Sequence, residues 1–142
     1  MVASAPIKEE ALSGSDIVLS VPEPEDLHYI ARWMTAGCYL PDRQRVRMMA
    51  DLVEQLSDAS MMQATHGRIG MHHGERIFFV EIVGGTDVYL CGPASVLNVP
   101  EKALACWTVA LAYVREVLGH GRIRVALGDE RKVERAVLRG LL

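Results

Sequence analysis

The sequence predicts an α/β fold, a three-layer α/β/α sandwich around a mixed sheet. Two observations carry this prediction. Short β-branched and apolar runs alternate along the chain with segments in which apolar residues recur at helical spacing. A long apolar helix, expected from about Glu101 to Leu118, lies between two short strands and is followed by a further helix. The predicted order of elements is β-α-α-β-β-β-α-β-α.

The first part of the chain is expected to form one strand and two helices. The strand is expected at 17–21, where β-branched residues precede two prolines. The first helix follows and ends at Gly37, and the second runs from Pro41 to Ser57. Their core faces repeat at helical spacing: Leu27, Ile30, Ala31 and Met34 in the first, and Val46, Met49, Ala50, Val53 and Leu56 in the second.

Strands are expected throughout 60–92, with a turn at 72–75. The segment 77–83 is nearly continuous in apolar residues, which predicts a central strand. The two glycines at 84–85 predict a hairpin that pairs this strand with 87–91.

The last part is expected to form the long helix, a strand and a short helix. The long helix has no charge between Lys102 and Arg115 and is apolar nearly all round, which predicts burial on most of its sides. A strand is expected at 123–127. The short helix begins with Asp129 as its N-cap. Its expected buried face is Val133, Ala136 and Val137.

Length and charge restrict the possible functions. A chain of 142 residues fits one domain, expected at 17–142, after a polar N-terminal arm at 1–16. The formal net charge of −3 argues against nucleic-acid binding by phosphate neutralisation. No apolar run approaches the roughly 20 residues that a membrane span needs. An arm of small and polar residues becomes ordered only when it packs against another surface. We therefore expect the arm to bind partner chains and the protein to form an oligomer or part of an assembly.

The cysteines indicate the compartment. Cys38, Cys91 and Cys106 are an odd number at no spacing typical of a metal site. Because Cys91 falls in an apolar strand and Cys106 in an apolar helix, buried and reduced thiols are expected. A reducing compartment follows, either the cytoplasm or a virion assembled there.

A group of histidines raises the possibility of a metal site. His66, His72, His73 and Glu75 offer imidazole and carboxylate groups, which are common zinc ligands. In an extended chain the adjacent His72 and His73 point to opposite faces and do not easily bind one ion. We therefore favour a solvated turn and expect no metal.

Glu81 interrupts the most apolar strand. A carboxylate there either lies on a solvated face or is buried with a raised pKa, as a general base would be. The alternation of the strand favours the first interpretation, and Glu81 is the base if the protein is an enzyme. Tyr89 and Tyr113 are aromatic residues in a strand and a buried helix, where such residues are usually core.

The order of elements resembles that of the GNAT acyltransferases, and two motifs add to the resemblance. The run at 17–27 looks like the family's first strand and its entry into the first helix, with Asp26 at the matching place. Near the C-terminus, Asp129, Val133 and Leu141 match the Asn, Ile and Phe of the family pattern Asn-x-x-(Ala)-Ile-x-x-Tyr-x-x-x-Gly-Phe.

Three departures from the family pattern stand beside these matches. In the family, a glycine-containing loop before the long helix holds the pyrophosphate of coenzyme A, and a tyrosine often acts as the acid. Here 96–99 carry side chains in place of glycines, Pro100 removes a backbone donor, and Ala136 stands where the tyrosine would be. The chain also stops at Leu142, where the family continues, so the final strand is expected to be missing and a sheet edge to be open.

The resemblance and its departures together predict a GNAT fold that has lost acyl-CoA catalysis and needs no cofactor. Such a protein would serve as a structural or assembly component. It is similar to the short GNAT-like proteins that tailed phages encode, some of which are packaged in the virion. Other protein chains are expected to bind through the N-terminal arm and the open sheet edge.

The alternative is an active acetyl-CoA-dependent N-acetyltransferase with a divergent pyrophosphate loop. The resemblance then implies Glu81 as the base, and Tyr89 as the acid in place of the family's tyrosine, with Tyr113 as the alternative acid. The cofactor would lie at the N-terminus of the long helix, against Asn98, Val99, Glu101 and Lys102.

One feature distinguishes the two interpretations. An enzyme needs exposed N–H groups at the start of the long helix and a gap between neighbouring strands. In a scaffold, side chains such as Leu97 or Trp107 would fill that gap.

Overall fold

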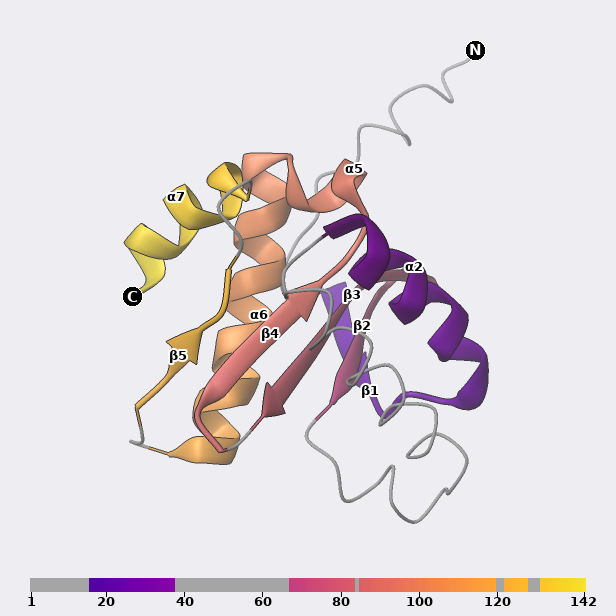
Figure 1. The fold of residues 1–142 in the computed structure, drawn as a ribbon, viewed down its shortest axis with the longest axis horizontal. Helices are drawn as coiled ribbons and strands as arrows, with labels where there is room; N and C mark the ends of the chain where they lie inside the picture. The colour runs from indigo at the N-terminus through magenta and orange to yellow at the C-terminus, as the bar shows by residue number, and fades with distance from the viewer. Residues whose placement is uncertain (1–15, 38–66, 84, 120–121, 128–130) are drawn as a thin grey trace.

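A computed structural model describes residues 16–37, 67–83, 85–119, 122–127 and 131–142 (Figure 1). In this part of the chain, five strands form one mixed sheet, with helix α2 on one face and helices α6 and α7 on the other. The α/β class and the layered arrangement are therefore confirmed. The helix expected at 41–57 and the N-terminal arm lie outside the described residues.

The strands follow one another across the sheet in sequence order. The first three pairings are antiparallel, and the last, between β4 and β5, is parallel because α6 connects the two strands. The expected central strand is indeed the middle one. The bounds are Ile17–Ser20 for β1, Arg68–His72 for β2, Glu75–Val83 for β3, Asp87–Cys91 for β4 and Arg124–Val125 for β5.

The helices differ from the prediction mainly at their ends. A 3-10 turn, η2, leads directly into α2, and a short helix, α5, which the sequence analysis did not predict, precedes α6. The bounds are Pro24–Asp26 for η2, Leu27–Gly37 for α2, Ala94–Leu97 for α5, Pro100–Leu118 for α6 and Lys132–Leu141 for α7. None of the described helices is long and apolar enough to cross a membrane.

Strand β3 divides its side chains between two hydrophobic clusters. Phe78 and Val80 lie in the cluster under α6, whereas Phe79 lies in the cluster under α2. This division follows from the two-residue period of a strand, since successive side chains point to opposite faces. Because both faces are covered, the strand reads as a continuous apolar run, as the sequence analysis expected.

The prediction that α6 is buried on most of its sides is confirmed. The fully buried residues are Ala103, Cys106, Trp107, Ala110, Leu111 and Val114. Partly buried residues that pack against the same cluster are Ala105, Val109, Tyr113, Val117 and Leu118. A narrow stripe stays exposed at Leu104, which is 46% exposed, and at Thr108 and Ala112, where small or apolar residues stand in place of charged ones.

The prediction for the last helix needs correction. Its N-cap is Arg131, and Asp129 lies outside the described residues. The buried side chains are Glu134 and Leu138, whereas Ala136 is exposed. Val133 and Val137 are half-buried, and Val137 packs against the core, so the expectation holds for Val137. The buried face of α7 is thus turned by about one residue from the expected apolar face, because Glu134 finds partners inside the protein.

An ion pair joins the turn before α2 to the hairpin formed by β2 and β3. Arg76 of β3 donates from Nε to Oδ1 of Asp26, and its guanidinium carbon lies 4.4 Å from the centroid of the Tyr29 ring. The other carboxylate oxygen of Asp26 accepts the backbone N–H of Glu23 at 2.7 Å. Asp26, the residue that matched the first family motif, therefore caps the turn and pairs with the sheet.

Gly70 in β2 packs against the ring of Phe78, and this contact yields a test of the fold. A Cβ at Gly70 would lie 2.4 Å from the nearest ring carbon, and Phe78 is completely buried. We expect Gly70→Ala to lower the free energy of unfolding by about 1–3 kcal/mol, since the core must shift to accept it. Urea unfolding monitored by circular dichroism measures this change.

The control is Gly140→Ala in α7, where a Cβ would meet no atom within 4 Å. This substitution should stabilise the protein by up to about 1 kcal/mol because alanine favours the helix. Equal effects of the two substitutions would contradict the described packing of β2 against β3.

Candidate functional site

The structure brings the two predicted catalytic residues together. Glu81 of β3 and Tyr89 of β4 are direct partners in the antiparallel register. Both point to the sheet face under α2, because Glu81 lies two residues after Phe79 and Tyr89 lies two residues before Cys91, and Phe79 and Cys91 belong to that cluster. Directly opposed residues have Cβ atoms about 4.5–5.5 Å apart, so the carboxylate and the phenol can reach one region of space. Both residues are partly buried.

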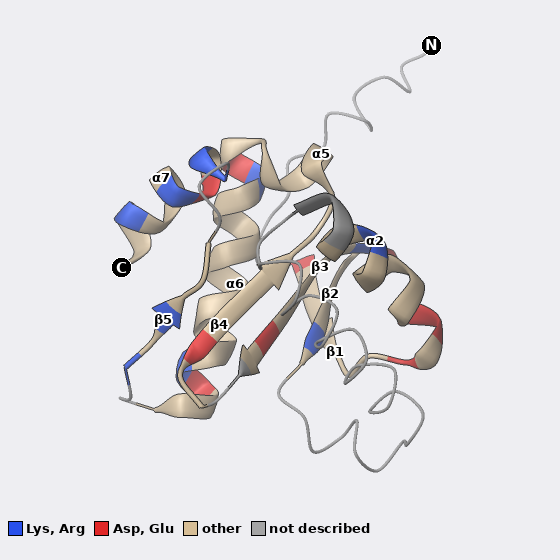
Figure 2. Ribbon diagram, in the orientation of Figure 1, with Lys and Arg blue, Asp and Glu red and all other residues tan. Residues whose placement is uncertain are grey.

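An ion pair extends this polar group toward the edge of the sheet. Arg124 of β5 donates from Nε to Oδ1 of Asp87 at 3.0 Å and from Nη2 to Oδ2 at 3.3 Å. Asp87 lies two residues before Tyr89 and so shares its face. Figure 2 shows an acidic position of β4 beside the basic position of β5, and a further acidic position on β3, on the other side of β4. The hydrogen bond from Arg124 lowers the pKa of the Asp87 carboxyl group.

The environment of Tyr89 keeps its phenol protonated. Burial raises the pKa of Tyr89, and the negative charges of Asp87 and Glu81 raise it further, while Arg124 acts in the opposite direction. A phenol with a raised pKa is a proton donor at neutral pH. Tyr113, the alternative acid, does not join this group. It packs into the α6 cluster on the opposite face, where the guanidinium of Arg68 lies 5.3 Å from its ring.

The predicted cofactor residues lie at the start of α6. Asn98 and Val99 form the turn between α5 and α6, and Glu101 and Lys102 are in the first turn of α6. The connecting turn offers few donors to an anion. The N–H of Asn98 bonds to the carbonyl of Ala94 at 3.0 Å, and the N–H of Val99 bonds to Val96 at 3.3 Å. Pro100, the first residue of α6, has no N–H. Three consecutive positions therefore present no available backbone donor.

The charge at the same turn also disfavours a phosphate. Glu101 is exposed in the first turn of α6 and already places a carboxylate at the positive end of the helix dipole. Lys102, next to it, is half-buried and supplies one opposing charge. A pyrophosphate at this helix end would meet Glu101 directly, which costs electrostatic energy at short distance.

The interior beside β4 is filled with side chains. Leu97 and Trp107 are 4% and 0% exposed and belong to the same cluster as Leu90 of β4. Val125 and Leu127, in and after β5, pack against this cluster. Parallel pairing of β4 with β5 covers only two positions, and side chains of this cluster fill the interior beside the two strands.

A buried ionic network closes the same region between α6 and α7. The indole N–H of Trp107 donates to Oε1 of Glu134 at 2.8 Å, and Arg131 donates to both carboxylate oxygens of Glu134. Arg131 and Glu134 are 7% and 2% exposed. A bidentate arginine plus an indole donor satisfies a carboxylate that could not otherwise be buried. The sequence does not predict this network, because no local pattern indicates that Trp107, Arg131 and Glu134 are in contact.

The cysteine prediction is confirmed for the two cysteines within the described residues. Cys91 and Cys106 are free and buried. Burial raises the pKa of Cys91, and it raises the pKa of Cys106 to about 12. Both thiols are therefore protonated and unreactive at neutral pH. Cys38 lies outside the described residues.

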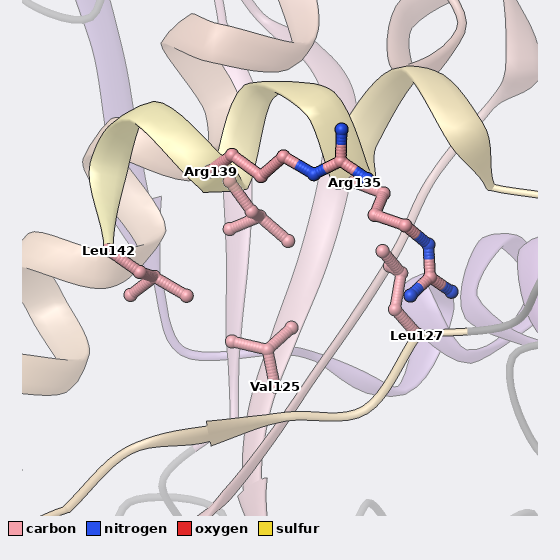
Figure 3. A pocket seen from close by; sticks show the side chains of 6 residues that line it. Val125, Leu127, Arg135, Arg139 and Leu142 are labelled. Carbon is pink, nitrogen blue, oxygen red and sulfur yellow. The ribbon is translucent and has the colours of Figure 1, made fainter.

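A groove between β5 and α7 is the second site that the sequence analysis missed. Figure 3 shows apolar side chains from both elements facing one another, with two arginines along α7. Its volume is about 350 Å³. The lining residues are Val125, Leu127, Arg135, Leu138, Arg139 and Leu142.

The expectation that His72 and His73 point to opposite faces is wrong. Their rings stack with centroids 4.0 Å apart. His73 has left the extended conformation, with a φ of 49°, because it lies in the turn between β2 and β3. Glu75 begins β3, and His66 lies outside the described residues.

Comparison with known proteins gives no family. No model of a known protein family matches the chain, and no curated protein or solved structure is similar to it.

The buried network generates a prediction for stability. Glu134→Ala should lower the free energy of unfolding by about 3–5 kcal/mol, because it leaves the Arg131 guanidinium buried without its carboxylate. Chemical unfolding measures the change. The control is Glu116→Ala, which removes an exposed carboxylate from α6 and should change stability by less than about 0.5 kcal/mol. A loss below about 1 kcal/mol for Glu134→Ala would contradict the network.

Proposed function

We propose that this protein is a GNAT-like fold without acyl-CoA catalysis that serves as a structural component of an assembly. The single observation that carries the proposal is the closed interior beside β4. Leu97, Trp107, Arg131 and Glu134 are all buried there, and the indole of Trp107 is bonded to Glu134. The GNAT resemblance implies a gap beside this strand for an acyl-thioester arm, and filled space supports the loss of that function. The mixed sheet with helices on both faces is the arrangement that the GNAT resemblance implies. A place in a phage virion follows from the same resemblance.

The turn before α6 supports the loss of cofactor binding. Acyl transfer needs a fixed pyrophosphate, and backbone N–H groups at a helix N-terminus are the usual way to hold one. The amides of Asn98 and Val99 are bonded to α5, and Pro100 has none. No glycine lies in this turn to let a phosphate approach the backbone.

The two edges of the sheet support an assembly role because they carry opposite charge. Among the described residues, β5 has a neighbouring strand on one side only, and so does β1. The β5 edge and α7 are basic, and their exposed or half-buried cations are Arg122, Arg124, Lys132, Arg135 and Arg139. Figure 2 shows this basic side opposite the acidic turn that leads into α2.

The β1 edge provides the complementary surface. Glu23 and Glu25 are exposed just after β1. A side-chain hydrogen bond with Glu25 and the charge of Glu25 raise the pKa of Glu23, while the nearby guanidinium of Arg76 acts in the opposite direction. A further cation from another chain would relieve the remaining repulsion between the two carboxylates. Val18, in the strand itself, is 63% exposed. The β1 edge thus offers an apolar side chain and two acids to the apolar, arginine-bearing groove between β5 and α7.

The occupant of the groove is therefore a second copy of this chain, with the β1 edge of one copy on the β5 edge of the next. Addition of a strand to an open edge satisfies the unpaired backbone groups of both edges. Because the two surfaces differ, the contact is heterologous, and it repeats into a ring or a filament.

The working N-acetyltransferase remains the second candidate, and the opposed pair of Glu81 and Tyr89 favours it. The carboxylate would take a proton from an amine, and the protonated phenol of Tyr89 would supply one to the leaving thiolate. This candidate requires that acetyl-CoA bind at the turn before α6.

Acetyl-CoA titration of the purified chain by calorimetry separates the two candidates. We expect no saturable binding up to about 1 mM, which would limit any binding free energy to about −4 kcal/mol. Micromolar binding that weakens in Lys102→Glu, but not in the charge-matched Arg32→Glu variant on α2, would replace the structural proposal with the enzyme.

Light scattering after size-exclusion chromatography tests the edge-to-edge contact. The average mass should rise with protein concentration and fall between about 0.05 and 0.5 M salt, since exposed charges are screened over shorter distances at high salt. The paired substitution Arg135→Glu with Arg139→Glu should give a monomer, and so should Glu23→Lys with Glu25→Lys.

Combining all four substitutions restores opposite charges on the two edges and should restore association. A wild-type chain that is monomeric at every concentration would contradict the contact. So would charge reversals that leave the mass unchanged.

A further inference from the structure

Three potential metal ligands from two separate segments meet at one end of the sheet. His72 is the last residue of β2, and His73 begins the turn into β3. Pairing of β1 with β2 places Ile17 opposite His72, which brings the preceding residue, Asp16, to the same end. One ligand atom from each of Asp16, His72 and His73 lies within 4.8 Å of the other two.

The turn conformation is what makes the two imidazoles neighbours. His73 and Gly74 have φ values of 49° and 83°, so both are in the left-handed region. This geometry is common for glycine and asparagine in a two-residue hairpin but unusual for histidine. It bends the chain so that the His73 ring stacks on that of His72, with 19° between the ring planes.

Within the described part of the chain, the Nε2 atom of His72 lacks the hydrogen bond that a buried nitrogen normally makes. It is buried, and no hydrogen-bond partner for it is found among the described residues. A buried nitrogen without a partner costs free energy, which a bound ion or a water would recover. One ligand atom of each of the exposed residues Asp16 and His73 lies within 4.8 Å of a nitrogen of the His72 ring.

We propose that Asp16, His72 and His73 bind a divalent transition-metal ion, with Zn²⁺ as the reference ion. Two imidazole nitrogens and one carboxylate oxygen form a donor set that suits Zn²⁺, Ni²⁺ and Cu²⁺. Mg²⁺ and Ca²⁺ prefer sets made of oxygen and should not bind here. Three protein ligands at an exposed site leave a coordination position for water.

Small side-chain movements complete the coordination. With metal–ligand distances of about 2.0–2.1 Å and tetrahedral angles, the ligand atoms lie about 3.4 Å apart. Because Asp16 and His73 are exposed, their side chains can rotate to this separation without disturbing the core. The bound ion would tie the start of β1 to the hairpin of β2 and β3. This site does not depend on the proposed assembly role.

The experiment uses the full chain after removal of metal with a chelator. Calorimetric titration with Zn²⁺ should show one ion bound per chain, and Co²⁺ should give the visible absorption of a four-coordinate complex with nitrogen and oxygen ligands. His73→Asn and Asp16→Asn should each weaken Zn²⁺ binding at least tenfold, since changes in the partners of metal ligands already cost about 10–100-fold.

His73→Asn is chosen because asparagine tolerates the left-handed turn, so the hairpin should fold without its metal ligand. The matched control is His28→Asn on α2, an exposed histidine outside the cluster, which should leave binding unchanged. Failure of the wild-type chain to bind Zn²⁺ would overturn the proposal. Equal affinity of wild type and His73→Asn would also overturn it, because the ion would then be held by other groups.

Discussion

The carboxylate of Glu134 holds the last helix to the rest of the described structure. It accepts hydrogen bonds from Trp107 in α6 and Arg131 at the cap of α7, and all three residues are almost fully buried. A buried carboxylate needs these partners, and the partners in turn fix the orientation of α7. The groove between β5 and α7 and the closed interior beside β4 both follow from that orientation.

Much of the fold was predictable because it rests on local pattern. The apolar run at 77–83 identified the central strand, the two glycines at 84–85 identified the β3–β4 hairpin, and Gly37 marked the end of α2. The buried face of α7 was not predictable in this way. Glu134 is inside only because Trp107 and Arg131, which the sequence does not link to it, satisfy its oxygens.

The candidate sites also combine features that local sequence predicts with features that depend on contacts between distant segments. The sequence selected Glu81 and Tyr89 separately by residue type, and the register of β3 and β4 made them opposed partners. His72 and His73 were expected to point to opposite faces, as they would in an extended chain. Their rings are neighbours because His73 is in the left-handed conformation of a turn. Contacts between distant segments, such as Asp16 with His72, arise from strand pairing, which no local pattern specifies.

The left-handed backbone conformation of His73 affects which amino acids are favoured at this position when stability is the only property under selection. A φ of 49° makes glycine or asparagine the less strained choice at this position, and histidine the more strained one. A library of variants screened for thermal stability alone should therefore drift away from histidine here. Retention of histidine under a screen for the protein's biological role would show that its imidazole is selected for chemistry that outweighs the conformational cost.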